Sequence, residues 1–454
     1  MSSEEIFRRA SYGPSSPVVG ERGARTRQRI VDVTLELFAA RSFHETSVDD
    51  IAKAAGISRA TLYQYFGSKD EIFIELMEEC GSALMRVVRR LGPLGADPQG
   101  FDNLHWWLGE WAWVYDKYAT MFAQWAHVDS AETSLKPMIN KFVDAYAARV
   151  TGRLESSGVE GLELSHAAAA LEALVTRFNY LRHSPVTAGL DQDALLDGLA
   201  VVVQLVLFPG TPAQALASLE LESGETARQA LPETLPRARA DRFDDLSPRA
   251  RRTVEELIDA ACRIFAVRGY HAANIDVVVA EAGFARGTFY KYFRDKLDLL
   301  TAVAETACED LVEVFARFAD IRPGPDAPTA LRTWLRAYLP VHKRYLGVIR
   351  VWTERQPEDP TLTSLSIQVS HALEAALATV LGHLERPYPV DIKAAVLLLH
   401  VMLEQVPVAV PEGARGASED EVIEIVALFV ERGLLNGTPV SRRRAGASTA
   451  KKSA

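Results

Sequence analysis

The sequence predicts an all-α protein built from two similar halves, and three observations support this fold class. Residues 29–72 and 256–299 align without a gap, 227 positions apart in a chain of 454, and 14 of the 44 aligned positions are identical. The composition favours helix formers such as Ala, Leu, Glu and Arg. Apolar residues in both copies recur at helical spacing. The length also exceeds what one core usually holds, so two domains are expected.

Local signals divide the first copy into four helices. Serine and acidic residues at capping spacing mark helix starts, and glycine marks a turn. The signals are, in chain order, a helix end near Arg41, a capping box Ser47-x-x-Asp50, a turn at Gly56, an N-cap at Ser58 for a helix over Arg59–Phe66, and Ser68-x-x-Glu71 for a long helix through Met85 or beyond. A short helix, a glycine turn, another helix and a long stalk are typical of a helix-turn-helix module.

The repeat and the composition shifts give a domain map. Polar or Pro- and Arg-rich stretches mark a lead, a linker and a tail. The expected parts are residues 1–20 (disordered lead), 21–70 (first helix-turn-helix module), 71–208 (first C-terminal helical domain), 209–247 (linker), 248–297 (second module), 298–435 (second C-terminal helical domain) and 436–454 (disordered basic tail). The candidates for a pseudo-two-fold interface between the halves are the nearly all-apolar helix Asp191–Phe208 and the segments Asp391–Gln405 and Glu421–Arg432.

Charge and cysteine content restrict the partners. The net charge is −10, yet both modules carry more Lys and Arg than Asp and Glu, and each opens with an arginine cluster. The three cysteines form no CxxC pair, so no disulfide framework, metal site or cofactor is expected. The N-terminus has no apolar signal region and no apolar stretch is long enough for a membrane span, which indicates a cytoplasmic protein without a membrane partner. Motifs for phosphate loops, nucleophile elbows and zinc proteases are absent, so an enzyme is not expected.

The run GISRATLYQYFGSKDEI, residues 56–72, resembles the signature of the tetracycline-repressor-like (TetR/AcrR) family of bacterial transcriptional regulators. The second copy, GFARGTFYKYFRDKLDL, resembles it less closely, because Ala285 replaces the capping Ser58, Ala273 and Asn274 replace Thr46 and Ser47, and Val279 and Glu281 break the usual alanine pattern. The two modules also differ at Ala60/Gly287. The resemblance implies an all-helical fold, with an N-terminal DNA-binding module and a C-terminal domain that binds a small ligand and dimerises through its last two helices. It also implies a bacterial cytoplasmic protein associated with the nucleoid.

Side chains of the repeated helix-turn-helix are the candidate DNA contacts. Arg59 and Arg286 suit a guanine edge, and Ser47 at a helix N-terminus suits a phosphate. The resemblance implies DNA-backbone contacts from the matching threonine, tyrosine and lysine positions. The complete set is Ser47, Ser58, Arg59, Ala60, Thr61, Tyr63 and Lys69 in the first module, and Arg286, Gly287, Thr288, Tyr290 and Lys296 in the second. The alternative for Arg59 and Tyr63 is an ordinary solvated surface, whereas Tyr65 and Phe66 are expected in the module core.

An aromatic cluster at helical spacing occurs in each C-terminal domain. The residues are Trp107, Trp111, Tyr115, Tyr118 and Trp125 in the first half, and Trp334, Tyr338, Tyr345 and Trp352 in the second. Ordinary bundle core explains such a cluster, since aromatics dominate cores. The alternative is an apolar pocket for a lipophilic or aromatic effector.

Together these features predict a ligand-responsive regulator, expected to be a repressor, that binds a double-stranded operator through two unlike modules in one chain. Two alternatives stay open: an architectural DNA-binding protein that senses nothing, and a regulator in which only the first module binds DNA. Self-association of two chains is also open at this point.

Overall fold

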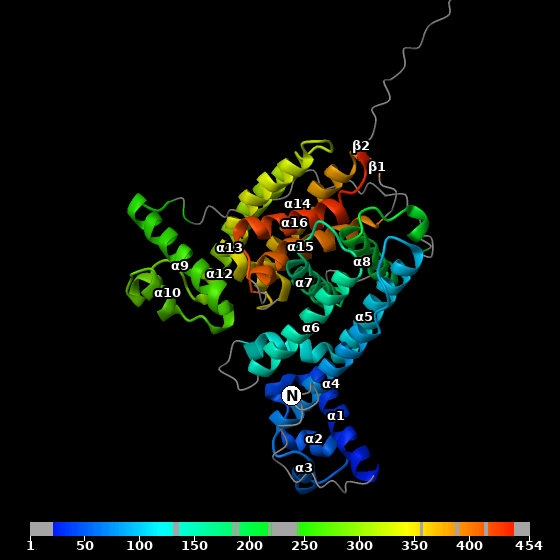
Figure 1. Ribbon diagram of the computed structural model, residues 1–454. Helices are drawn as coiled ribbons and strands as arrows, with labels where there is room; N and C mark the ends of the chain where they lie inside the picture. The colour runs from blue at the N-terminus through cyan, green and yellow to red at the C-terminus, as the bar shows by residue number, and fades with distance from the viewer. Residues whose placement is uncertain are drawn as a thin grey trace, which may run out of the picture. The chain divides into compact units, whose positions relative to one another are not determined.

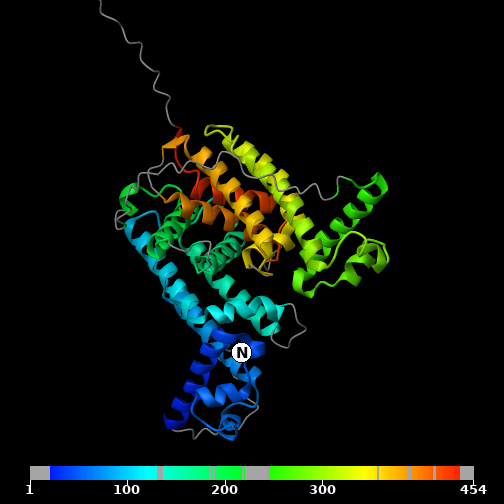
Figure 2. The ribbon, with the colours of Figure 1, turned by 180° about the vertical axis from the view of Figure 1, so that it is seen from behind.

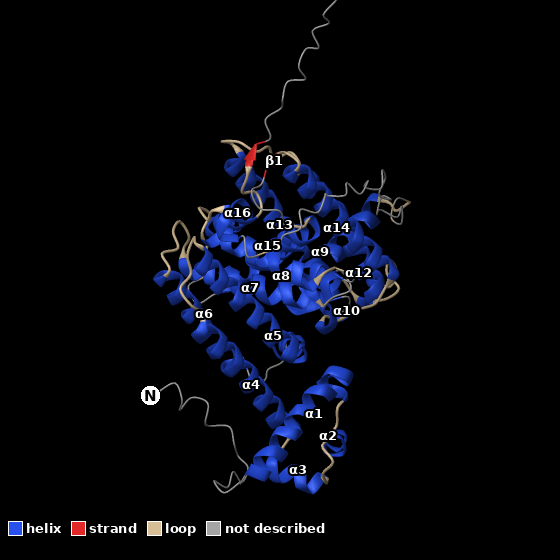
Figure 3. Cartoon of the chain, turned by 90° about the vertical axis from the view of Figure 1, so that its right-hand side faces the viewer, coloured by secondary structure: helices blue, strands red, loops and turns tan. Residues whose placement is uncertain are grey.

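The computed structural model describes residues 21–129, 136–183, 187, 190–216, 219, 243, 245–354, 357–385, 390–412 and 416–439. These ranges are almost entirely helical, as Figure 3 shows, which confirms the predicted all-α class. The one strand pair among them joins β1 (Leu384–Glu385) to β2 (Thr438–Pro439) in antiparallel register. Regular structure therefore extends into the predicted tail as far as Pro439. The predicted lead and most of the linker lie outside the described residues.

Each half contributes eight α-helices within the described ranges. Those of the first half are α1 (Glu21–Glu45), α2 (Val48–Ala54), α3 (Arg59–Tyr65), α4 (Lys69–Arg90), α5 (Pro98–Asp129), α6 (Lys136–Ser156), α7 (Leu164–Arg182) and α8 (Gln192–Leu207), followed by the 3-10 turn η2 (Ala213–Leu216). Those of the second are α9 (Pro248–Ala272), α10 (Ile275–Glu281), α11 (Arg286–Phe289), α12 (Lys296–Phe318), α13 (Ala327–Glu354), α14 (Pro360–Leu381), α15 (Ile392–Glu412) and α16 (Glu419–Gly433). The offset of 227 relates all eight pairs to within a few residues at each end, so the duplication covers the whole half.

The chain separates into two compact units, the first comprising residues 1–95 and 99–158. It contains α1 to α4, most of α5, and α6. Ile30, Phe38 and Leu62, from α1 and α3, are completely or almost completely buried in the core of the first module. Further along, α4 packs on α6, and Gly81 allows the close approach because a Cβ there would meet the Phe142 ring at 3.1 Å. The long α4 thus joins the module to the following helices.

The second unit comprises residues 96–98 and 159–454 and includes α7 and α8 of the first half together with the whole second half. Helices α7, α8, α15 and α16 pack as a four-helix bundle, in which α15 lies against α7 and α16 against α8 (Figure 1). The three segments expected at the pseudo-two-fold interface fall in α8, α15 and α16. Helix α7 completes the bundle; its buried residues include three alanines and also the polar His166, Asn179 and Arg182, so its apolar pattern is weaker.

Helix α8 shows why a helix can lack a polar face. Every residue from Gly198 to Leu207 is buried, and the one amide among them, Gln204, donates to Thr211 Oγ1 at 2.9 Å. Helices α14 and α15 are long and apolar enough to cross a membrane by length and composition alone. For α15 the four-helix bundle already accounts for the apolar surface, because two-thirds of its most apolar window is buried there.

In the second half, α12 and α13 connect the helix-turn-helix module with the other helices of the second unit. Helix α12 continues from the module and packs against α14, and α13 packs against α9. Figure 2 shows these green and yellow helices from behind. The contact of α13 with α9 is close at Gly347, where a Cβ would lie 2.5 Å from the carbonyl carbon of Phe265. A salt bridge between Arg344 and Asp259 joins the same two helices.

Candidate functional site

The recognition helix of the first module is held by one cap and two buried side chains. Ser58 Oγ accepts a hydrogen bond from the Thr61 backbone N–H at 3.0 Å and so begins α3. Leu62 and Phe66 are buried, which turns the opposite face of α3 toward solvent. On that face Tyr63 keeps 41% of its surface exposed. The helix therefore offers polar side chains outward, as its sequence predicts, while Tyr65 is only half-buried.

Arg59 on this face is oriented by two neighbours. Its Nη1 donates to Asp49 Oδ2 at 2.9 Å and its Nη2 donates to Tyr63 Oη at 3.3 Å. The hydrogen bond with Tyr63, aided by the Asp49 carboxylate, raises the pKa of Arg59. The guanidinium also lies 5.6 Å from the centroid of the Tyr63 ring. A cation with further N–H groups to donate is thus displayed on the helix-turn-helix surface.

The second module repeats this triplet at the equivalent positions. Arg286 donates to Asp276 at 3.0 and 3.1 Å and to Tyr290 Oη at 3.4 Å. Tyr290 is 50% exposed, and its hydrogen bond with Arg286 raises the pKa of that arginine. The two modules therefore present the same Asp–Arg–Tyr arrangement. The aspartates were not among the predicted site residues, although their identity in both copies was visible in the aligned sequences.

The recognition helices differ in length. Helix α11 has only four residues, where α3 has seven. Ala285 has no hydroxyl to cap it, and the Thr288 N–H instead donates to the Ala285 carbonyl at 2.8 Å in a tighter turn. Gly287, in place of Ala60, lowers helix propensity further. The two substitutions seen in the sequence thus have a structural consequence in the second module.

The predicted backbone-contacting lysines already have partners within the protein. Lys69 Nζ donates to the carbonyls of Phe43 and Thr46 at 2.7 and 2.9 Å, and so holds the turn between α1 and α2. Lys296 does the same between α9 and α10, with Tyr270 and Ala273 both at 2.9 Å. Partial burial lowers the pKa of Lys296. A DNA contact from these lysines stays a prediction, since in this structure they fix the turn.

The N-termini of α2 and α10 are both capped. Ser47 and Asp50 form the predicted capping box, with Asp50 N–H donating to Ser47 Oγ at 3.1 Å and Ser47 N–H to Asp50 at 3.0 Å. In the second module the Asn274 amide oxygen accepts from the Val277 N–H at 2.9 Å instead. Ser47 is exposed at its helix end, which is compatible with the predicted phosphate contact. Thr61 and Thr288, by contrast, are half-buried beside their caps.

The aromatic residues predicted in the first C-terminal domain lie on helix α5. Trp107, Trp111, Tyr115 and Tyr118 are each buried. Trp111 and Tyr115 stack with ring centroids 6.0 Å apart, and Tyr115 stacks on Phe122 at 4.7 Å. Helix α5 is kinked at Tyr118. The side chain of Trp125, also predicted here, lies outside the described residues.

The second cluster, on α13, is equally buried and better hydrogen-bonded. Trp334 and Tyr338 stack at 5.2 Å; Trp334 Nε1 donates to Val314 O at 2.7 Å and Tyr338 Oη to Leu403 O at 3.1 Å. Tyr345 Oη donates to Asp310 at 2.6 Å. Burial lowers the pKa of His342 to about 4 against the opposing effect of Glu404, so this imidazole is neutral at pH 7.

Three buried donors or acceptors in these clusters lack a hydrogen-bond partner within the part of the chain that the structure describes. They are Trp107 Nε1, Trp352 Nε1 and His342 Nδ1. Buried indole N–H groups usually have a partner, so each such atom requires an explanation such as a water or a ligand. The aromatic clusters therefore combine ordinary core packing with a few unsatisfied polar atoms.

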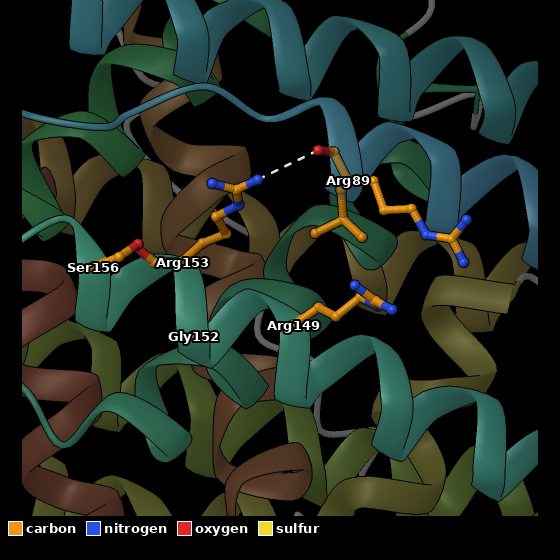
Figure 4. Close-up of a pocket in the computed structure, with 6 residues that line it drawn as sticks. Arg89, Arg149, Gly152, Arg153 and Ser156 are labelled. Carbon is orange, nitrogen blue, oxygen red and sulfur yellow. Dashed lines mark hydrogen bonds between the residues drawn. The ribbon is translucent and has the colours of Figure 1, made fainter. Parts of the chain in front are cut away.

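A hollow of about 370 Å³ lies between α4 and α6, and none of the aromatic residues just described lines it (Figure 4). Arg89, Arg149 and Arg153 line it with Ser156, and Arg153 Nη2 donates to the Arg89 carbonyl at 3.3 Å.

Among the described residues no group of three His, Cys, Asp or Glu is placed to hold a metal ion. Burial raises the pKa of the Cys80 thiol to about 12 and contributes most to raising those of Cys262 and Cys308 to about 11.

Comparison with known proteins identifies the repeated module. The family model described as bacterial regulatory proteins, tetR family, matches residues 30–76 and again residues 257–303. The chain is 52% identical over 59 residues to a putative mycofactocin biosynthesis transcriptional regulator of Mycobacterium tuberculosis, and 41% identical over 58 residues to the HTH-type transcriptional regulator AcrR of Shigella flexneri. These stretches are 13% of this chain and span only 30% and 27% of the two relatives.

A longer but weaker similarity connects the chain with a biofilm operon negative transcriptional regulator, IcaR, of Staphylococcus aureus. It is 25% identical over 138 residues, which is 28% of this chain and 73% of that relative. The strong similarities are thus of module size, and both segments that the family model matches contain the helix-turn-helix described above.

Proposed function

We propose that this chain, which belongs to the tetR family of bacterial regulatory proteins through a module in each half, is a DNA-binding transcriptional regulator that uses both modules on one operator. The observation that carries this proposal is the repeated exposed triplet, Asp49, Arg59 and Tyr63 in one module and its equivalents in the other. A guanidinium displayed on a helix that fits the major groove can donate two hydrogen bonds to guanine, whereas a tyrosine hydroxyl suits a phosphate.

The mode of binding follows from the covalent link between the modules. Family homodimers, as the resemblance implies, supply two identical modules, whereas this chain supplies two different ones. We propose that each module enters the major groove of one half-site, at a centre-to-centre spacing of about 34 Å or a multiple of it. Because α3 and α11 differ at Ser58/Ala285 and Ala60/Gly287, the half-sites are expected to differ too.

Effector binding is proposed for the buried aromatic clusters. The unsatisfied atoms Trp107 Nε1, Trp352 Nε1 and His342 Nδ1 support it, since a ligand with a hydrogen-bonding group could satisfy them. In the second half a signal has a short route, because α13 carries Trp352 and closely approaches Phe265 of α9. A ligand that shifted α13 would shift the first helix of the module and change DNA affinity. We propose a lipophilic or aromatic effector that releases the protein from its operator.

The first experiment is footprinting of the chain on the DNA upstream of its own gene, with fluorescence anisotropy to measure affinity. R59A/Y63A should remove protection of one half-site and R286A/Y290A protection of the other. The control is R317A, which removes an exposed arginine that pairs with Glu313 on α12, outside the module. An unchanged footprint for R286A/Y290A would support the alternative in which only the first module reads DNA.

Sensing is tested separately from binding. Titration of lipophilic and aromatic compounds into the protein–operator complex should find one that lowers affinity, and W352F should weaken its effect because phenylalanine has no indole N–H. If no compound changes DNA affinity while the footprint persists, the architectural alternative would be favoured over regulation by a ligand.

A further inference from the structure

The four-helix bundle contains a charged pair in an unusual place. Arg177 on α7 and Glu404 on α15 contact each other, with Nη2–Oε1 at 2.6 Å and Nε–Oε2 at 3.1 Å. They are 227 positions apart, so each residue is the other's equivalent in the duplication. In a symmetric dimer a residue that meets its own equivalent lies on the two-fold axis. This salt bridge therefore marks the pseudo-two-fold axis of the bundle.

In a second contact between equivalent positions, the two residues differ in side-chain size instead of charge. Gly433 on α16 is the equivalent of Val206 on α8, and the two lie against each other. A Cβ added at Gly433 would be 3.0 Å from Val206 Cγ2 and 2.8 Å from Val202 Cγ1. Two valines thus do not fit the observed separation of α8 and α16. The close packing of α8 on α16 therefore requires a valine at position 206 to face a glycine at position 433.

Other contacts between the halves also lack a symmetric counterpart. Arg432 on α16 donates to Val206 O at 3.2 Å and Gly161 O at 3.1 Å. The equivalent position on α8 is Leu205, which has no polar group to make the reciprocal bonds. His166 Nε2 lies 2.9 Å from Gly416 O, and Lys393 stands at the equivalent of His166. The two faces of the interface have therefore become different from each other.

We infer that the α7/α8 face is specific for the α15/α16 face and selects against pairing with a second copy of itself. The geometry gives the reason. Paired with its own copy, α7 would place two Arg177 guanidinium groups together on the axis, and α15 would place two Glu404 carboxylates there. Glu404 is 2% exposed and Arg177 13%, so solvent would screen either repulsion poorly. Removing one partner from a buried pair is already strongly unfavourable.

The environment of Glu404 supports its role as the acceptor of this pair. Thr353 Oγ1 donates to Glu404 Oε1 at 3.3 Å, and His400 Nε2 lies 3.5 Å from Oε2. The equivalents of these two residues in the first half are Ala126 and Ala173, which offer no such groups. Side chains that can stabilise a carboxylate therefore lie beside position 404, whereas their equivalents in the first half are alanines. This inference concerns the pairing of the two helical faces and goes beyond DNA binding. It does not depend on the proposed binding to an operator.

Charge reversal in the full-length chain tests the inference. R177E places two carboxylates on the axis and E404R two guanidinium groups, so each variant should unfold with an equilibrium constant higher by on the order of 100-fold. The double reversal R177E/E404R restores opposite charges and should recover part of the loss, because Thr353 and His400 lie beside position 404 alone. The matched control is R336E, which disrupts an exposed pair with Asp420 and should change little.

Mixing the single variants gives the sharper result. When R177E and E404R chains are refolded together, each can satisfy its axis by exchanging halves with the other, and light scattering should show a 1:1 complex of two chains. R177M/E404M, which keeps an apolar axis, should remain folded but form no such complex with R177E. The inference would be overturned if the double reversal were no more stable than the singles, or if the mixture gave no two-chain complex; neither outcome depends on whether a single variant folds alone.

Discussion

The second recognition helix should lengthen if its two sequence departures are reversed. Ala285 has φ and ψ of −79° and 151°, nearly those of Ser58 at −77° and 154°, so a serine there can cap without strain. A Cβ added at Gly287 would have no other atom within 4 Å, so alanine fits. A new N-cap is worth about 1 kcal/mol and the glycine replacement about 1 kcal/mol. The variant A285S/G287A should therefore stabilise α11 by about 2 kcal/mol.

Amide hydrogen exchange measures this directly. A change of about 2 kcal/mol corresponds to roughly 30-fold slower exchange through local opening, expected at residues 288–292 in A285S/G287A. The reciprocal variant S58A/A60G should accelerate exchange in α3 by a similar factor, because the same cap and propensity are removed there. If neither variant changed exchange in its own helix, the difference between α3 and α11 would not come from these two positions, and the reasoning would be refuted.

Three further predictions concern the lysine that holds the turn between α1 and α2, the charge on the surface proposed to bind DNA, and the acid sensitivity of the four-helix bundle. K69M should lower the free energy of unfolding of the first unit by about 2 kcal/mol, since two carbonyls lose their donor; urea denaturation checks this, and an unchanged midpoint would contradict it. D49N should raise operator affinity several-fold at low salt, because Arg59 no longer shares its charge with a carboxylate; weaker binding would mean that the orientation Asp49 gives to Arg59 matters more than the charge it neutralises. The pKa of Glu404 is held below its usual 4.5, with Arg177 as the main cause of the lowering against the opposing effect of burial. Its stabilisation is thus fully present above pH 4.5 and is lost as the pH falls through the lowered pKa, so below about pH 4.5 the urea midpoint should fall more steeply for the wild type than for E404Q.

Much of the fold could be predicted because local signals and tertiary structure agree. The capping box at Ser47, the N-cap at Ser58 and the buried Leu62 and Phe66 all occur as the residue pattern indicates. The segment of α8 was expected in an interface because it has no polar face, and the segment of α16 was a candidate for the same interface. The duplication then extended each prediction to the second half.

The pairing chemistry could not be predicted from the sequence alone. Arg177 and Glu404 are ordinary charged residues within helices, and nothing local shows that they meet on an axis. Only the packing of α7 on α15 brings the two equivalents into contact. The lysines illustrate the opposite case, since Lys69 and Lys296 match positions that the resemblance assigns to DNA, yet their amino groups bond to turn carbonyls. A side chain's partner is set by tertiary structure, which a motif does not contain.

The most direct test of a single-chain regulator with two unlike modules is the stoichiometry of the operator complex. Native mass spectrometry of the protein on its footprinted DNA should find one chain per operator, and R286A/Y290A should lose protection of one half-site only. Two chains on a longer symmetric footprint, with R286A/Y290A binding as tightly as the wild type, would contradict the account.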